Sequence, residues 1–414
     1  MLIEHLNRQL LEREQQGLRR QRRTAESPCA PQQQVCLAPG APAQPLLNFC
    51  SNDYLGLASH PALIQALAEG AALHGVGSGA SHLVSGHGAA HDALEAALAD
   101  WLGGAIPEAR ALSFGSGYMA NQALLTALGD AAGTVLFTDK LNHASLIDGA
   151  LLARAQVQRY PHNRVDRLAT LLAQSTAPLK LIVTDAVFSM DGDLAPLPEL
   201  LALAEAHDAW LILDDAHGLG ILGPHGEGSL AHFGPQTGPG LRSERLILMG
   251  TLGKAMGTSG AFVLAHRTVI DWLVQTARPY IYTTASSPAL AHATVASIAL
   301  VRGDAGRRLR AQLHARIAQL RHGLSELLAA HPACGWQLLE SATAIQPVLI
   351  GDNHRTAALG QALLARGCWV GAIRPPTVPA GTARLRITLS AAHTEAQVAQ
   401  LLDALAQELA GASP

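Results

Sequence analysis

The sequence predicts an α/β fold in which a large domain is built around a mostly parallel sheet and a smaller α+β domain follows it. Between about residues 60 and 290, short apolar runs alternate with Ala/Leu-rich helical patterns. Apolar strands separated by helices are typical of a parallel sheet that is covered on both faces. Hydrophobic residues make up 49% of the 414 residues and charged residues only 15%, which excludes extensive disorder.

The N-terminal segment is expected to form a helix followed by an arm. Leucines recur at helical spacing within residues 1–24, which predicts an amphipathic helix. Residues 25–46 are rich in Pro, Gln and Ala, and we interpret them as an arm or linker. We therefore place an N-terminal helix and arm at residues 1–50, a large domain at 51–295 and a small C-terminal domain at 296–414.

The order of elements in the two domains follows from the hydrophobic pattern. Buried strands of the large domain are expected at residues 110–114, 134–139, 179–188, 210–218 and 245–251. The helices between them include residues 118–128 and 197–208. A long helical region after about residue 290 leads into the small domain, whose strands are expected at residues 344–351, 368–373 and 383–390.

Composition and charge exclude several classes of protein. The net charge of −3 argues against a nucleic-acid-binding protein, which would usually be strongly basic. The five cysteines include no CxxC pair, so we expect reduced thiols in a cytoplasmic protein without a disulfide framework or zinc site. No stretch of about 18 apolar residues is free of charge, and the N-terminus lacks the apolar core of a signal peptide. We therefore expect no association with a membrane.

Polar residues follow several of the expected strands, and ligands of parallel sheets bind at the carboxyl ends of the strands. The turn from Gly115 to Tyr118 lies between a strand and a helix, where free N–H groups can bind a phosphate. A plain strand-to-helix turn explains it equally well. Asp214 and His217 directly follow another strand. A buried carboxylate there needs a partner such as a protonated pyridine nitrogen, or else it caps the next turn.

Lysine chemistry has few candidates, because lysine occurs only at three positions. Lys140 and Lys180 flank strands in places typical of surface residues. Lys254 follows a buried strand, three residues after Thr251, in a turn between two glycines. A lysine in such a pocket can act as a Schiff-base nucleophile when its pKa is lowered.

Three further features have a weaker interpretation. Residues 189–193 (SMDGD) form either a plain turn or an acidic pair that attracts a metal, but the spaced ligands of an EF-hand are missing and no metal site is predicted. His143 is a candidate for stacking on a flat cofactor, although any one of 19 histidines is more often structural. Arg384 and Arg386 share one face of a strand, which either binds a carboxylate or faces solvent.

Seven motifs occur along the chain in the order SNDYLGL, GSGYMANQ, NHASL, FSMDGD, DDAHG, TLGKAMG and RPPTVPAGTARLR. Together they resemble those of the α-oxoamine synthases, which are fold-type I pyridoxal-phosphate (PLP) enzymes. The resemblance runs from about residue 46 to the C-terminal end. It implies a mostly parallel seven-stranded sheet in the large domain, a smaller α+β domain, and pyridoxal 5'-phosphate as the cofactor.

The resemblance also implies roles for individual positions. Lys254 would hold the cofactor covalently and move the substrate proton, Asp214 would pair with the pyridinium nitrogen, and His217 would bond the ring oxygen. His143 would stack on the ring, with Ser189 nearby, so the implied catalytic residues are the two histidines with Lys254 and Asp214. The implied phosphate contacts are Gly117, Tyr118 and Thr251. The implied substrate contacts are Arg19, Asn52, His143, Thr377 and, for the amino-acid carboxylate, Arg386.

The C-terminal stretch narrows the expected reaction. Residues 367–393 are most similar to the family members that condense L-alanine with a pimeloyl thioester in biotin biosynthesis, and the thiol is either coenzyme A or an acyl carrier protein. The family usually forms homodimers. Two departures from its pattern are a long loop at residues 232–243 and Asp185, where the family often has Glu.

Three other readings stay open or are discounted. Another α-oxoamine synthase, such as glycine C-acetyltransferase or 5-aminolevulinate synthase, would use glycine. A non-catalytic protein on the same fold would be expected to lack Lys254 or Asp214, and both are present. A nicotinamide-dependent dehydrogenase needs a glycine-rich turn after a strand, whereas GVGSGA at residues 75–80 follows a helical pattern.

Overall fold

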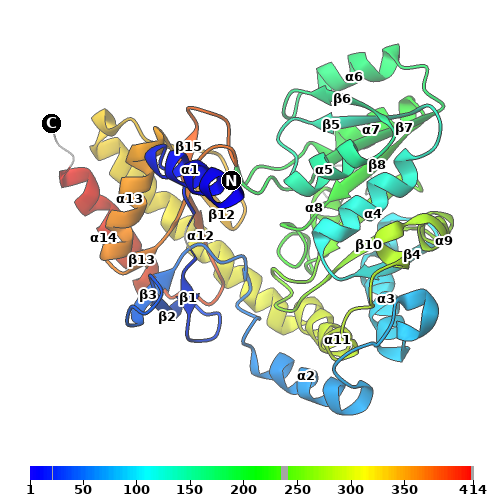
Figure 1. Cartoon of the computed structure of the whole chain (residues 1–414), viewed down its shortest axis with the longest axis horizontal. Helices are drawn as coiled ribbons and strands as arrows, with labels where there is room; N and C mark the ends of the chain where they lie inside the picture. Colours follow the sequence, from blue (N-terminus) through cyan, green and yellow to red (C-terminus); the bar gives the residue numbers. More distant parts are fainter. Residues whose placement is uncertain (21, 235–240, 412–414) are drawn as a thin grey trace. The chain divides into compact units, whose positions relative to one another are not determined.

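The computed structural model describes residues 1–20, 22–234 and 241–411, and these form two compact units (Figure 1). One unit comprises residues 1–56, 190–193 and 311–414, and the other comprises residues 57–189 and 194–310. We refer to them as the terminal unit and the central unit and describe each by itself. The central part of the loop expected at residues 232–243 lies outside the described residues.

The central unit is built around a seven-stranded sheet, which confirms the predicted α/β fold. Its strands, in spatial order, are β4 (Ala109–Phe114), β10 (Ala261–His266), β9 (Leu246–Thr251), β8 (Ala209–Asp214), β7 (Leu179–Asp185), β5 (Thr134–Asp139) and β6 (Gln156–Tyr160). All neighbours pair in parallel except β10, which runs antiparallel to both of its neighbours. The carboxyl ends of β4, β5, β7, β8 and β9 therefore lie along the same edge of the sheet.

Two strands of this sheet were not expected from the sequence. The edge strand β6 has the sequence QVQRY, and among its residues only Tyr160 is buried, so it lacks the apolar run of an interior strand. The strand β10 is apolar and buried over nearly its whole length. It follows the turn after β9 closely because an antiparallel neighbour needs no helical crossover. A pattern of strands alternating with helices overlooks such a strand.

Helices cover the sheet because each has an apolar face. The helix α4 (Gly117–Gly129) packs against β4, β9 and β10, and α7 (Leu197–Ala206) packs against β8. The core against which α4 packs consists mainly of Ala, Leu, Val and Ile with few aromatic rings, as the composition requires. The other helical segments of the central unit are α2 (Pro61–His74), η1 (His82–Gly86), α3 (Ala89–Leu102), η2 (Gly103–Ala105), α5 (Ala144–Leu152), α6 (Val165–Gln174), α8 (Ser229–Phe233), α9 (Arg267–Thr276), α10 (Arg278–Ile281) and α11 (Pro288–Arg302).

The terminal unit contains two four-stranded sheets. The first has the order β1 (Thr24–Ala25), β2 (Gln32–Cys36), β3 (Gln44–Asn48) and β13 (Cys368–Trp369). The second has the order β11 (Gln337–Leu338), β12 (Ile345–Gly351), β15 (Ala383–Thr388) and β14 (Gly371–Ile373). The helical segments are α1 (Leu2–Gln15), α12 (Asp304–Ala330), of which residues 311–330 belong to this unit, η3 (Pro332–Cys334), α13 (Asn353–Ala365) and α14 (Glu395–Gly411).

Three expectations for this unit were wrong in detail. The N-terminal helix ends at Gln15 rather than near residue 24, because Gly17 adopts a left-handed backbone with φ of 66°. Residues 25–46, interpreted as an arm, contribute to three strands. Residues 368–373 form two short strands in different sheets, β13 beside β3 and β14 beside β15. No helix among the described residues is long and apolar enough to cross a membrane.

Candidate active site

Lys254 and His217 lie next to each other at the carboxyl edge of the central sheet. Lys254 sits in the turn after β9 and His217 in the turn after β8, and the Lys254 Nζ lies 3.0 Å from the His217 Nε2. The lysine turn is tightly packed, because Gly257 has a φ of 67° and a side chain there would meet the backbone of Leu57 at 2.5 Å. A compact turn of this kind holds the amine in a fixed place beside an imidazole.

Asp214, the last residue of β8, is buried and receives two hydrogen bonds. The Asn121 Nδ2 donates to one carboxylate oxygen at 2.8 Å and the Ala216 N–H donates to the other at 3.0 Å. Asn121 lies in α4 with no exposed surface, and its Nδ2 also donates to the Ser145 hydroxyl at 2.9 Å. Donors aimed at a buried carboxylate offset part of the cost of removing it from water. The arrangement suits an ionised acid that faces a cationic N–H.

His143 is the N-terminal cap of α5 and is held by two residues. Its Nδ1 lies 2.7 Å from the Ser145 hydroxyl, and its backbone N–H donates to the Asp185 carboxylate at 2.7 Å. Burial lowers the pKa of His143, which favours a neutral ring. Burial, followed by the charge of Asp214, raises the pKa of Asp185 well above its ordinary value. A neutral imidazole with a fixed orientation is suited to stacking on a flat ring.

The turn from β4 to α4 forms a cradle with the end of β9. The helix begins at Gly117, and the Ser116 hydroxyl caps it by accepting a bond from the Met119 N–H. A Cβ atom added to Gly117 would lie 2.7 Å from the Thr251 Cγ2, so a larger residue there would force Thr251 or the start of α4 to shift. The Thr251 hydroxyl is buried and has no hydrogen-bond partner among the described residues. The free N–H groups of the helix start and this hydroxyl together suit an anionic group such as a phosphate.

Tyr118 and Ser189 are less buried than the residues above. The Tyr118 ring is 41% exposed, and its hydroxyl donates to the carboxylate of Asp148. Ser189 lies in the turn after β7 and is half-buried. Both belong to the central unit, as do the cofactor-site residues named above.

The paired arginines of β15 have different partners, although they share a face of the strand as predicted. The Arg384 guanidinium forms an ion pair with Asp191 and also donates to the Met190 carbonyl. The Arg386 guanidinium donates to the Asn52 Oδ1 at 3.2 Å. Both arginines are buried, so the solvent-facing alternative for this strand is wrong. Asp191, one of the acidic residues considered as a metal ligand, forms an ion pair with Arg384 instead.

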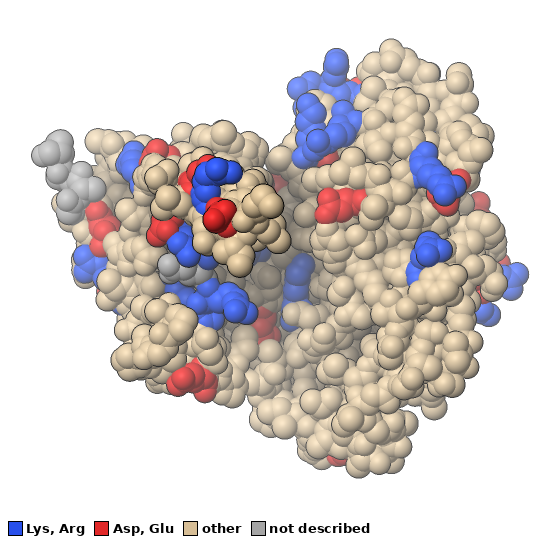
Figure 2. All heavy atoms as spheres, in the orientation of Figure 1, with Lys and Arg blue, Asp and Glu red and all other residues tan. Residues whose placement is uncertain are grey.

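Arg19 and Thr377 also lie in the terminal unit. Arg19 forms an exposed ion pair with Glu14. Thr377 lies in the loop after β14, where its N–H donates to the Arg374 carbonyl, and the Arg374 guanidinium donates to the Gly17 carbonyl. Arg19 and Arg374 both line a cavity of about 520 Å³, and Figure 2 shows basic side chains gathered on the face of this unit that carries α1.

The sequence analysis did not single out three buried residues around this site. Asn121 and Ser145 form hydrogen bonds within the predicted site. Each is a polar residue near the N-terminal end of an Ala/Leu-rich helix, and this position could have identified them. Asp215 follows Asp214 and accepts bonds from the backbone N–H and the hydroxyl of Ser229. Burial raises the pKa of Asp215 to about 7.

Comparison with known proteins places the chain among PLP enzymes and their relatives. The family model for aminotransferase class I and II matches residues 44–405. A curated 8-amino-7-oxononanoate synthase of Polaromonas naphthalenivorans is 66% identical over all of both chains. A solved structure of SPT with PLP superposes with a TM-score of 0.86 at 29% identity, covering 99% of this chain and 98% of that one. An 8-amino-7-oxononanoate synthase from Francisella tularensis has a TM-score of 0.69 at 28% identity, covering 88% and 98%.

Proposed function

The chain belongs to the class I and II aminotransferase family, and within it to the 8-amino-7-oxononanoate synthases; from this premise we propose that it condenses L-alanine with a pimeloyl thioester in biotin biosynthesis. It is a PLP-dependent acyltransferase. The observation on which the proposal rests is the arrangement of Lys254, His217 and Asp214 at the ends of two neighbouring parallel strands. This is where parallel sheets bind ligands.

The residues present fit pyridoxal phosphate. The Gly117 cradle and the buried Thr251 hydroxyl suit its phosphate, and Tyr118 lies at the same helix start. We assign Asp214 to the pyridine nitrogen and His217 to the ring oxygen. We assign His143 to the ring face, Ser189 to the ring's surroundings and Lys254 to the covalent attachment. When bound, the cofactor supplies an electron sink for a carbanion at the amino-acid Cα.

The remaining chemistry falls to side chains of the chain itself. The Lys254 Nζ takes the Cα proton of alanine and later returns a proton, so it must be able to exist as a neutral amine. The adjacent His217 ring at 3.0 Å accepts or donates a hydrogen bond according to its tautomer. Asn121 and the Ala216 N–H donate to the Asp214 carboxylate, and a carboxylate at this position would favour a protonated ring nitrogen.

The proposed reaction forms one carbon–carbon bond and breaks a carbon–sulfur and a carbon–carbon bond. After Lys254 has taken the Cα proton, the alanine Cα attacks the thioester carbonyl, and the C–S bond breaks to release the thiolate, which takes up a proton. The original carboxyl group is then lost as carbon dioxide, and Lys254 returns a proton to the Cα. We assign Arg386 to the alanine carboxylate, because a buried guanidinium binds a carboxylate strongly. Asn52, which accepts a bond from Arg386, is placed next to it. Arg19 and Thr377 are assigned to the acyl chain or product.

A substrate matrix tests this proposal. The purified enzyme would be assayed with L-alanine, glycine and L-serine, each against pimeloyl, acetyl, succinyl and palmitoyl thioesters, with carbon dioxide and free thiol as readouts. We expect turnover with alanine and pimeloyl thioester to exceed every other pair. Preference for glycine with an acetyl or succinyl thioester would instead identify another α-oxoamine synthase. Pimeloyl-coenzyme A and pimeloyl acyl carrier protein, compared at equal concentration, would identify the carrier.

We further propose that the protein acts as a homodimer in the cytoplasm, since its family usually forms homodimers. Light scattering after size-exclusion chromatography measures the mass directly. A mass equal to that of one chain, 43.2 kDa, in a fully active sample would contradict the dimer.

A further inference from the structure

Three histidines of the central unit lie together outside the residues assigned to the reaction. His82 is the first residue of η1, His87 follows η1, and His91 lies in the first turn of α3. Their candidate ligand atoms all lie within 4.8 Å of one another. We propose that these three side chains form a site for one divalent transition-metal ion of the kind that imidazole binds well, such as Zn²⁺. This inference does not depend on the proposed reaction.

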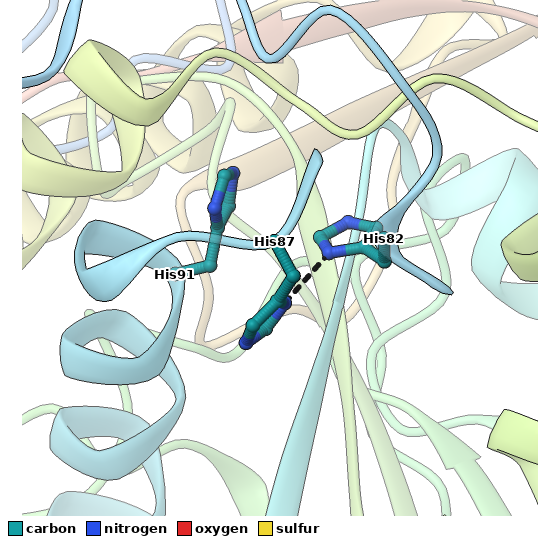
Figure 3. A group of neighbouring side chains, drawn as sticks. All are labelled: His82, His87 and His91. Atoms are coloured by element: carbon teal, nitrogen blue, oxygen red, sulfur yellow. Dashed lines mark hydrogen bonds between the residues drawn. The ribbon is translucent and has the colours of Figure 1, made fainter. Parts of the chain in front are cut away.

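Two of the rings are already aimed at each other. The Nδ1 atoms of His82 and His87 are 2.8 Å apart, and Figure 3 shows the two rings facing across this contact. Two imidazole nitrogens at this distance share a single proton. A Zn²⁺ ion bonded to both at about 2.0–2.1 Å needs a separation of roughly 3.3 Å for a tetrahedral angle. The rings would therefore move apart by only about half an ångström.

The outer nitrogen of His87 has the partner that metal-binding histidines usually have. Its Nε2 lies 2.9 Å from a carboxylate oxygen of Asp92, so it carries the proton and leaves Nδ1 as the ligand atom. A carboxylate that holds the outer N–H of a histidine fixes the ring and increases the basicity of the inner nitrogen. Glu95, one helical turn farther along α3, accepts bonds from the Ser113 N–H and hydroxyl at 2.8 and 2.7 Å and is therefore engaged elsewhere. The Asp92 carboxylate is thus the acidic group that supports His87 as a ligand.

His82 is held in place by an aromatic neighbour. Its ring stacks on Tyr280 with the ring centres 4.7 Å apart, which restricts its rotation. A neutral ring can bind a metal through Nδ1 when its proton moves to Nε2, so the step requires no net loss of a proton.

His91 completes the site at a modest cost. Its Nε2 donates to the Ser286 carbonyl at 2.9 Å, and its Nδ1 accepts a bond from the Gly88 N–H at 3.1 Å. The Ser286 bond holds the ring in the tautomer whose Nδ1 has a lone pair. To bind the ion, His91 gives up the bond from the Gly88 N–H, which caps the start of α3. Three histidines and a water molecule make a common tetrahedral zinc site.

The sequence did not predict a metal site at these three histidines. The pattern HxxxxHxxxH matches no standard zinc motif. The residues converge only because η1 folds its first residue back over the start of α3.

Metal binding to the cofactor-loaded full-length protein tests the site. After treatment with a chelator, the protein would be dialysed against Zn²⁺, or against Mg²⁺ as a comparison, and bound metal counted by mass spectrometry. We expect one Zn²⁺ per chain and no retained Mg²⁺. His82→Gln and His87→Gln should weaken Zn²⁺ binding by more than about ten-fold, and Asp92→Asn by about ten-fold.

A matched control separates this site from general binding to histidines. His322 lies in α12 with its side chain 76% exposed, so His322→Gln should bind Zn²⁺ as the parent does. Equal retention of Zn²⁺ by the parent and by His87→Gln would overturn the proposal. If the variants fail to fold, the zinc-edge X-ray absorption spectrum of the parent protein tests the site instead. We expect scattering from at least two imidazoles, and a shell of oxygen ligands alone would refute the site.

Discussion

The cradle between α4 and β9 permits a sharp test through Gly117→Ala. The added Cβ would lie 2.7 Å from the Thr251 Cγ2, well inside ordinary carbon–carbon contact. Relief requires the first turn of α4 to move away from β9, which opens the cradle. Overpacking of this kind costs about 1–3 kcal/mol, which corresponds to a loss of roughly 5- to 150-fold in an equilibrium constant. We expect the affinity for pyridoxal phosphate to fall within this range.

The same turn supplies the matched control and the rescue. A Cβ on Gly115 would meet only the Met119 Cε at 3.7 Å, which is ordinary contact, so Gly115→Ala should bind the cofactor nearly as the parent does. Thr251→Ser keeps the hydroxyl and removes the methyl group that clashes, so it should restore affinity when combined with Gly117→Ala.

The assay for this series is a titration with pyridoxal phosphate followed by absorbance, with urea denaturation as a check on folding. A double-mutant cycle between positions 117 and 251 should show a coupling free energy of about the size of the loss. If Gly115→Ala and Gly117→Ala weaken binding equally, or if Thr251→Ser restores nothing, the argument from the Gly117 contact is wrong.

Three further predictions concern polar groups in and around the site. Asn121→Ala removes a donor to Asp214 and should lower the free energy of unfolding by about 1–3 kcal/mol, measured in urea, with cofactor affinity falling in parallel. Burial raises the pKa of Asp215 from 3.8 to about 7, so between about pH 4 and 7 the folded state holds a proton on Asp215 that the unfolded state has lost. The free energy of unfolding should therefore fall as pH rises through this range, by at most about 4 kcal/mol. Asp215→Asn should flatten this dependence in thermal melts, and an unchanged slope would assign it to other groups. Lys254→Ala should lose the absorption band of lysine-bound cofactor and slow turnover by about 10²- to 10⁴-fold, so an intact band would refute its assignment.

Much of the fold could be predicted because the hydrophobic pattern of each interior parallel strand is the one that a sheet covered by helices requires. The strands β5, β7, β8 and β9 are apolar runs in a sheet covered by helices, and their sequences permit little else. The strands β6 and β10 were not predicted, for different reasons. A polar edge strand has only one buried side chain to reveal it, and an antiparallel strand breaks the alternation of strands with helices.

The candidate site could be predicted only in part. Of the three lysines only Lys254 lies in a glycine-flanked turn after a buried strand, and Asp214 and Thr251 end neighbouring strands, so local sequence was sufficient to name them as candidates. The partners were not predictable in this way. Asn121 and Asp214 are 93 residues apart, and Arg384 and Asp191 are 193 residues apart. No local pattern encodes either contact.

The sequence by itself therefore determined the class of fold, the parallel strands β5, β7, β8 and β9 of the sheet interior, and the lysine and aspartate at their ends, because buried strands need unbroken apolar runs and polar residues there are conspicuous. Only the tertiary structure decided which side chains meet. It gave Arg384 an acidic partner, gave Asp214 its amide donor and brought His82, His87 and His91 together. The physical reason is that the first two contacts follow from how elements distant in sequence pack and the third from how η1 folds back on α3, whereas hydrophobic periodicity reports only which face of each element is buried.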